Sequence, residues 1–237
     1  MEILLIAALI PPLFLMVQVY RTDKIEREPV GLIVKLFLFG IISVIPTGIV
    51  ESLADSIVMQ GIFAGSTSAF ARFIQFFFLV ALVEEFFKYI FLKIGSWRNP
   101  AFDYVFDAVV YSAAVALGFA AFENIGYVFS FGIEVAGLRA VTAIPGHCIF
   151  GIFMGHYYGL AKMAEKDGNE AAKRGFLTKA LWIPVLLHGF YDFAASSGSE
   201  IMTIVFFAFV VALDVVAIRR VREYSKSDTM IDRGGWH

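Results

Sequence analysis

Residues 70–94 read FARFIQFFFLVALVEEFFKYIFLKI, an apolar run whose second half contains Glu84, Glu85 and Lys88. A helix needs roughly 20 apolar residues to cross a hydrocarbon core about 30 Å thick, and this run is long enough. An ionisable side chain inside such a helix is costly unless it faces the protein interior. The run therefore predicts a membrane-spanning helix that turns its ionisable residues toward other helices.

The composition of the whole chain also indicates a membrane protein. Of its 237 residues, 59% are hydrophobic, 17% are charged and 26 are Phe, and the mean hydropathy is +0.77. A soluble domain has about 25% charged residues and needs a polar coat that this chain lacks. Most soluble enzymes and disordered chains are excluded, and the single Cys148 excludes a disulfide scaffold. The lipid bilayer is the expected surrounding, and no nucleic-acid partner is expected.

Seven apolar runs predict the fold class, an all-α polytopic membrane helix bundle that forms one membrane-embedded domain over 1–237. The expected spans are 2–20, 30–54, 70–94, 105–130, 138–161, 180–196 and 200–218, and a polar tail follows at 219–237. The first run lacks the basic start of a signal peptide, since Glu2 is its only charge. We expect it to be retained and kinked at Pro11 and Pro12.

The placement of basic residues predicts the orientation. Segments after the first, third, fifth and seventh runs contain lysine or arginine, whereas 55–69, 131–137 and 197–199 contain neither. The basic residues in these segments are Arg21, Lys24, Arg27, Lys93, Arg98, Lys162, Lys166, Lys173, Arg174, Lys179, Arg219, Arg220, Arg222, Lys226 and Arg233. By the positive-inside rule the N-terminus lies outside and the C-terminus lies in the cytoplasm.

Four of the runs carry polar or ionisable residues within the expected spans, namely Glu84, Glu85, Lys88, Glu123, Tyr127, His147, His188 and Asp192. Both Glu84 and Glu85 can reach Lys88, but they point about 100° apart on a helix. One carboxylate is then left for another task. His188 and Asp192 are one helical turn apart, so the carboxylate can fix the orientation of the imidazole.

Small residues predict that 138–161 packs closely against 105–130, because a stripe at four-residue intervals lets two backbones approach. The stripe consists of His147, Gly151, Gly155 and Gly159. At a rise of about 1.5 Å per residue, Glu123, His147 and His188 lie roughly 10–15 Å from the outer ends of their spans, and Glu84 lies nearer to 20 Å. One polar chamber that opens toward the outer leaflet can hold them all.

Each of these groups alone also fits a structural role, such as an ion pair between Glu84 and Lys88 or an interhelical hydrogen bond from Glu123. Their combination exceeds what packing needs. Activation of a water molecule requires a carboxylate base, oriented imidazoles and exclusion of bulk water, and the chain offers all three. Cys148 is not expected to be a nucleophile, because it points about 100° away from His147.

Four motifs in chain order resemble the signatures of the PrsW intramembrane proteases, which are relatives of the Rce1-type CAAX proteases and of the APH-1 subunit of γ-secretase. The motifs are Glu84-Glu85-x-x-Lys88, Phe122-Glu123-x-x-x-Tyr127, His147-x-x-x-Gly151 and His188-x-x-x-Asp192. The resemblance implies an endopeptidase of the bacterial plasma membrane that cuts a single-span membrane protein near its outer side. The typical substrate is an anti-sigma factor, cut at site 1 in regulated proteolysis.

The expected catalytic residues are Glu84, Glu85, His147 and His188, and the expected supporting residues are Lys88, Glu123, Tyr127 and Asp192. Two mechanisms remain open at this point. In one, Glu84 or Glu85 activates water without a metal. In the other, zinc is held by His147, His188 and a carboxylate, which is either Glu123 or Asp192. Two other functions also remain open, a proton-coupled transporter and a non-catalytic scaffold like APH-1.

Overall fold

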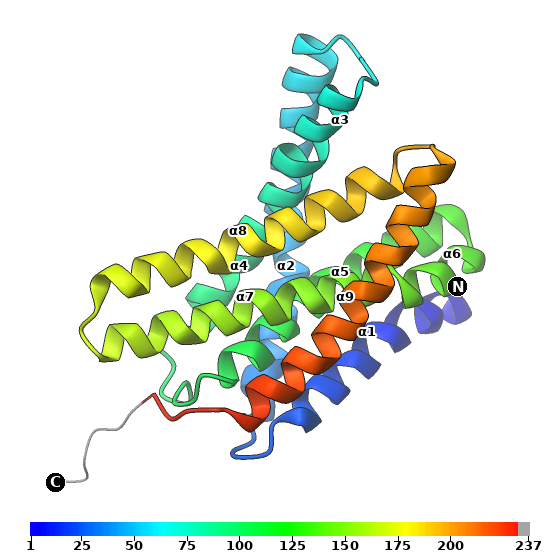
Figure 1. The fold of residues 1–237 in the computed structure, drawn as a ribbon. Coiled ribbons are helices and arrows are strands. Elements are labelled where there is room, and N and C mark those ends of the chain that lie inside the picture. Colours follow the sequence, from blue (N-terminus) through cyan, green and yellow to red (C-terminus); the bar gives the residue numbers. More distant parts are fainter. Residues whose placement is uncertain (232–237) are drawn as a thin grey trace, which may run out of the picture.

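The computed structural model describes residues 1–231. Its helices are α1 Glu2–Thr22, α2 Val30–Ala54, η1 Asp55–Ile62, α3 Ala69–Ile74, η2 Gln75–Ala81, α4 Leu82–Ser96, α5 Asp107–Phe131, α6 Ile133–Val141, α7 Ala143–Lys166, α8 Glu170–Ala195 and α9 Glu200–Lys226 (Figure 1). The stretches η1 and η2 are π-helical; η1 continues α2, and η2 joins α3 to α4. Over residues 1–231 the chain forms no strand, only an isolated bridge between Tyr104 and Met230. The predicted all-α class is confirmed.

Five helical segments are long and apolar enough to cross a membrane, namely Glu2–Thr22, Val30–Ile62, Asp107–Phe131, Ile133–Lys166 and Glu200–Lys226. They contain five of the seven expected spans. The other two, 70–94 and 180–196, are helical but are not among these five segments, and they carry most of the ionisable residues of the predicted chamber. Passage of these two helices through the bilayer and the orientation of the termini stay predictions.

Two boundaries around the fifth expected span are wrong. The segment 131–137 is not a loop, because Gly132 adopts a left-handed φ of +89° and reverses the chain into α6. This short helix packs against α1 and α5. The span expected at 138–161 is in turn divided at Thr142, where α6 ends and α7 begins.

Other helices are longer than the hydropathy predicts. Part of the expected loop 55–69 is η1, and α8 begins at Glu170 because the Asn169 side chain accepts a hydrogen bond from the N–H of Ala172 at 3.0 Å. The polar tail expected from 219 is helical as far as Lys226. There the Ser225 hydroxyl donates to the Thr22 carbonyl oxygen at 2.7 Å, which joins α9 to the end of α1. Residues 232–237, including Arg233, lie outside the described part of the chain.

Helix α5 forms the centre of the bundle. In the most apolar 18-residue stretch of α5, 83% of the residues are buried inside the protein. The corresponding share in α9 is 22%, so α5 faces protein and α9 faces lipid. A Cβ atom at Gly155 of α7 would lie 2.4 Å from the carbonyl oxygen of Ala108, and one at Gly118 of α5 would lie 2.0 Å from that of Phe37. Glycine therefore permits backbone contact of α5 with α7 and with α2, and the predicted close packing of α5 and α7 is confirmed.

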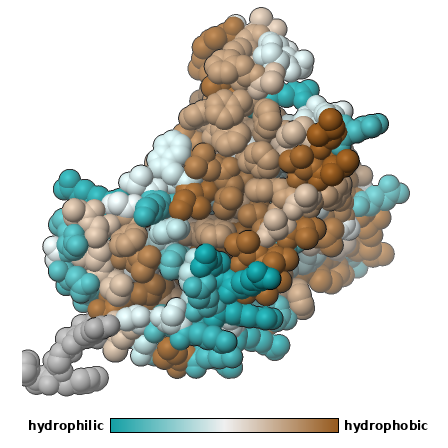
Figure 2. Space-filling view, in the orientation of Figure 1, coloured by the Kyte–Doolittle hydropathy of each residue, from teal (hydrophilic) through white to brown (hydrophobic). Residues whose placement is uncertain are grey.

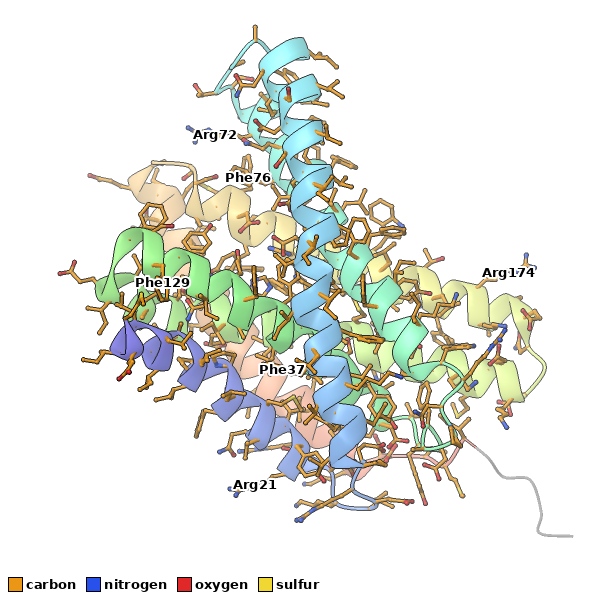
Figure 3. The ribbon with its side chains drawn as sticks, turned by 180° about the vertical axis from the view of Figure 1, so that it is seen from behind. Arg21, Phe37, Arg72, Phe76, Phe129 and Arg174 are labelled. Carbon is orange, nitrogen blue, oxygen red and sulfur yellow. The ribbon has the colours of Figure 1, made fainter. Side chains whose placement is uncertain are left out.

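The end of α2 forms a hairpin with η1 and α3 that projects beyond the other helices (Figure 1). Its visible surface is largely apolar, whereas hydrophilic residues gather at the opposite end, near the α1–α2 loop (Figure 2). Arg72 of α3 donates to the Ser196 carbonyl oxygen at 2.8 Å, which ties the hairpin to the end of α8 (Figure 3). The α8–α9 hairpin predicted around 196–199 is confirmed, with Gly198 at a φ of +68°.

Candidate active site

Three of the expected site residues come from α4, which begins directly after the π-helical stretch η2. Glu84, Glu85 and Lys88 are all buried, with relative exposures of 6%, 0% and 1%. The Lys88 ammonium lies 2.9 Å from Glu84 Oε2 and 2.9 Å from Glu85 Oε1, so one cation pairs with both carboxylates. It also lies 4.0 Å from the centre of the Phe119 ring of α5, which adds a cation–π contact.

His147 of α7 connects this triad to α5. Its Nδ1 lies 3.2 Å from Lys88 Nζ, and its Nε2 lies 2.9 Å from Glu123 Oε2. Because an ammonium can only donate, Nδ1 is assigned as the acceptor, and Nε2–H then donates to Glu123. Arg139 of α6 holds the same Glu123 oxygen at 2.8 Å. The imidazole is thus fixed with an unprotonated nitrogen facing the Lys88 ammonium.

His188 of α8 is held in a parallel manner. Its Nδ1 lies 2.9 Å from Glu85 Oε1 and 4.0 Å from Glu84 Oε2, and its Nε2 lies 3.2 Å from Asp192 Oδ2. The two imidazole centroids are 5.3 Å apart. Each histidine therefore turns Nδ1 toward α4, His147 toward Lys88 and His188 toward the glutamates, and turns Nε2 toward an outer carboxylate, which is the predicted role of Asp192.

A cavity of about 300 Å³ lies beside these groups. It is lined by Glu51, Phe76, Val80, Glu84, Glu123, Tyr127, Arg139, Ala143, His147, Phe150, His188, Tyr191 and Asp192. Glu84 faces the cavity, whereas Glu85 lies behind it and has one buried oxygen, Oε2, without a hydrogen-bond partner. A larger groove of about 800 Å³ lies between α1, α7 and α9, but none of the expected site residues lines it. The smaller cavity is therefore the candidate site.

All eight site residues predicted from the sequence surround this one cavity or lie directly against it. Sequence reasoning missed two others. Glu51 of α2 lines the cavity with a buried Oε1 that has no hydrogen-bond partner, and Arg139 holds Glu123 and lies 4.0 Å from the centre of the Tyr127 ring. An acidic residue inside an apolar run was the signal for Glu51. Arg139 gave no such signal, because it lies near the end of its expected span.

The donor set fits a metal ion. One ligand atom from each of Glu84, Glu85, His147 and His188 lies within 4.8 Å of the others, and all four residues are buried. Two imidazoles with carboxylates form a zinc donor set, and outer carboxylates on the second ring nitrogens commonly orient such ligands. Glu123 and Asp192, expected as alternative ligands, occupy these outer positions instead. A metal would have to displace the Lys88 ammonium from His147 Nδ1.

A helical membrane protein with buried glutamates and oriented imidazoles around a small enclosed cavity belongs to the class of intramembrane hydrolases. The chain is a member of the PrsW family: the model for the "PrsW family intramembrane metalloprotease" matches residues 28–217. Members of this family are peptidases, so the chain is a multi-pass membrane peptidase whose buried histidine and glutamate cluster can hold a metal such as zinc. The resemblance inferred from the four motifs is confirmed.

Three curated relatives are all called Protease PrsW. The protein of Oceanobacillus iheyensis is 35% identical over 94% of this chain and 97% of the relative. The protein of Geobacillus kaustophilus is 32% identical over 93% and 91%. The protein of Bacillus subtilis is 33% identical over 82% and 83%. No solved structure matched the chain.

Proposed function

We propose that this chain hydrolyses a peptide bond of a single-span membrane protein near the outer face of the bacterial plasma membrane, and that its substrate is an anti-sigma factor. The observation that carries the proposal is the cavity where Glu84, His147 and His188 meet among apolar helices. The positive-inside rule places the basic loops in the cytoplasm and the mouth of this cavity toward the outer leaflet.

Glu84 is the general base of the proposed reaction. It lines the cavity, whereas Glu85 is fully buried and bound to both Lys88 and His188. Glu84 accepts a proton from a water molecule in the cavity and later returns it to the leaving amine. Glu85 orients the His188 ring, and Lys88 keeps the two adjacent carboxylates compatible with burial.

The imidazoles of His147 and His188 lie where they can orient the water and stabilise the oxyanion of the tetrahedral intermediate. Glu123 with Arg139 holds the first ring, and Asp192 holds the second. When bound, zinc would act as a Lewis acid toward the substrate carbonyl. Its ligands would be His147, His188 and one glutamate of α4.

The direct test is cleavage of tagged single-span anti-sigma factors by purified protein in proteoliposomes. We expect Glu84→Gln to lower turnover by about 10²–10⁴-fold, since this is the usual contribution of a general base. His147→Ala and His188→Ala should also abolish cleavage, with helix content unchanged by circular dichroism. Glu134→Gln, which changes a glutamate of α6 outside the cavity lining, is the matched control. Cleavage at the normal rate by Glu84→Gln would overturn this assignment.

Metal removal separates the two mechanisms. We expect a chelator to stop cleavage and added zinc to restore it, with about one zinc per chain in the active protein. Full turnover by protein shown to be metal-free would contradict the zinc mechanism and leave the chemistry to Glu84 and the imidazoles alone.

A further inference from the structure

A second group of buried carboxylates lies away from the cavity, at the end of the bundle that carries the α1–α2 loop. Asp23 and Glu28 belong to that loop, and Asp107 begins α5. Their relative exposures are 4%, 3% and 1%, and one carboxylate oxygen from each lies within 4.8 Å of the others. We refer to these three residues as the loop cluster.

Within residues 1–231 the loop cluster has no basic partner. In the part of the chain that the structure describes, no lysine, arginine or histidine forms an ion pair with any of its three carboxylates. Asp23 Oδ2 is buried and has no hydrogen-bond partner at all. The Asp228 carboxylate lies close enough to Asp23 to repel its negative charge. Burying carboxylate charge without a cation is costly, and within residues 1–231 this group of carboxyl groups has no positive charge beside it.

Glu28 and Asp107 hydrogen-bond each other and therefore share a proton, and further contacts hold both carboxyl groups in place. The Tyr111 hydroxyl hydrogen-bonds Glu28 and lies 2.9 Å from the Ala101 carbonyl oxygen. Asp107 Oδ2 accepts the backbone N–H groups of Asp103 and Tyr104 at 3.0 and 2.7 Å. These bonds fix the positions of two carboxylates while Asp23 Oδ2 remains unpartnered.

We propose that the loop cluster is a binding site for a hard divalent cation, Mg²⁺ or Ca²⁺, held by Asp23, Glu28 and Asp107. Carboxylate oxygens are the ligands that these ions prefer. Oxygens on opposite sides of a Ca²⁺ ion lie about 5 Å apart, given Ca–O distances of roughly 2.3–2.6 Å, so a spacing within 4.8 Å suits one shared ion. Carbonyl groups or water would complete the coordination.

The site would join segments that are distant in the sequence. Asp23 and Glu28 fix the α1–α2 loop, and Asp107 fixes the turn before α5. The same turn pairs with the chain after α9, because Val105 N–H donates to the Thr229 carbonyl at 3.1 Å and Ile231 N–H donates to that of Asp103 at 2.6 Å. A cation would therefore stabilise this end of the bundle without contacting the active site.

The test compares thermal unfolding of the full-length protein in detergent after treatment with EDTA. We expect MgCl2 or CaCl2, at about 100 times its dissociation constant, to raise the Tm by roughly 5–10 °C. Asp23→Asn and Glu28→Gln should lose this shift. The control Glu26→Gln, which changes an exposed glutamate of the same loop, should retain it. Separate MgCl2 and CaCl2 titrations decide which ion is bound more tightly.

Terbium luminescence gives a second measurement that does not depend on unfolding. Excitation of the tyrosine should sensitise Tb³⁺ bound beside Tyr111, and the signal should be competed by Ca²⁺ or Mg²⁺ and absent in Asp23→Asn. The proposal is overturned if neither cation shifts the Tm of the unmodified protein. It is also overturned if the shift and the terbium signal persist in both Asp23→Asn and Glu28→Gln.

Discussion

The molecule contains two groups of buried carboxylates that solve the problem of buried charge in different ways. Around the cavity, Glu84 and Glu85 share Lys88 and approach two imidazoles, while Glu123 is held by Arg139. In the loop cluster of Asp23, Glu28 and Asp107, no side chain supplies a positive charge within residues 1–231. The first group is neutralised by the chain itself, and we infer that the second requires an ion from solution.

This difference suggests separate roles. A carboxylate that is to act as a base must be held at a fixed position beside a space that a substrate can enter, and the first group borders such a cavity. Carboxylates that hold a structural cation need proximity and no such space. The two groups share no residue, although α5 contributes Asp107 to one and Glu123 to the other, so their charges can be changed by separate substitutions.

The largest effect on stability is expected when Lys88, the cation beside Glu84 and Glu85, is replaced. Lys88→Met leaves Glu84 and Glu85 buried without their lysine counter-ion, and breaking such a buried pair costs about 3–5 kcal/mol. The free energy of unfolding in detergent, followed by circular dichroism, measures this loss. Lys93→Met, at an exposed position on the same helix, should change it by less than about 0.5 kcal/mol. Equal stabilities of the two variants would show that Lys88 is not the counter-ion described.

A smaller effect is expected when an imidazole loses its outer carboxylate. Asp192→Asn keeps the shape of the side chain but weakens its hold on His188 Nε2, so cleavage should fall by about 10–100-fold. A positioning role predicts that kcat falls while KM is nearly unchanged. Asp167→Asn, in the exposed α7–α8 loop, is the control. A rise in KM with an unchanged kcat would instead indicate that Asp192 binds substrate.

The smallest effect concerns the loop cluster in the absence of divalent cations. Asp23→Asn removes a buried carboxylate that Asp228 repels, and the asparagine can still accept the backbone hydrogen bonds from Ile25 and Glu26. With EDTA present at pH 8, unfolding should therefore become less favourable by about 1 kcal/mol. Glu26→Gln should have little effect. A destabilised Asp23→Asn protein under these conditions would mean that the charge of Asp23 is already compensated.

Much of the site could be predicted because lipid imposes a strict rule on polar residues. A glutamate or histidine within an apolar run must face other helices, so Glu84, His147 and His188 are conspicuous in the sequence. The glycine stripe of α7 similarly predicted its contact with α5, where a Cβ at Gly155 would lie 2.4 Å from a carbonyl oxygen.

Other features depend on tertiary contacts that no local pattern reveals. Arg139 looks like an ordinary residue near the end of a span until Gly132 reverses the chain and brings α6 beside Glu123. Hydropathy also placed helix ends where apolar residues stop, whereas α8 and α9 extend through charged segments that face water. The loop cluster was missed because Asp23 and Glu28 lie between spans, where acidic residues are unremarkable.

The most direct test of the central claim is an experimental structure of the Glu84→Gln protein with a bound substrate segment. The account predicts that the scissile carbonyl lies in the cavity of about 300 Å³, within reach of residue 84, His147 and His188. A substrate whose scissile bond lies in the larger groove beside Cys148 and Asp214, away from the imidazoles, would contradict the account.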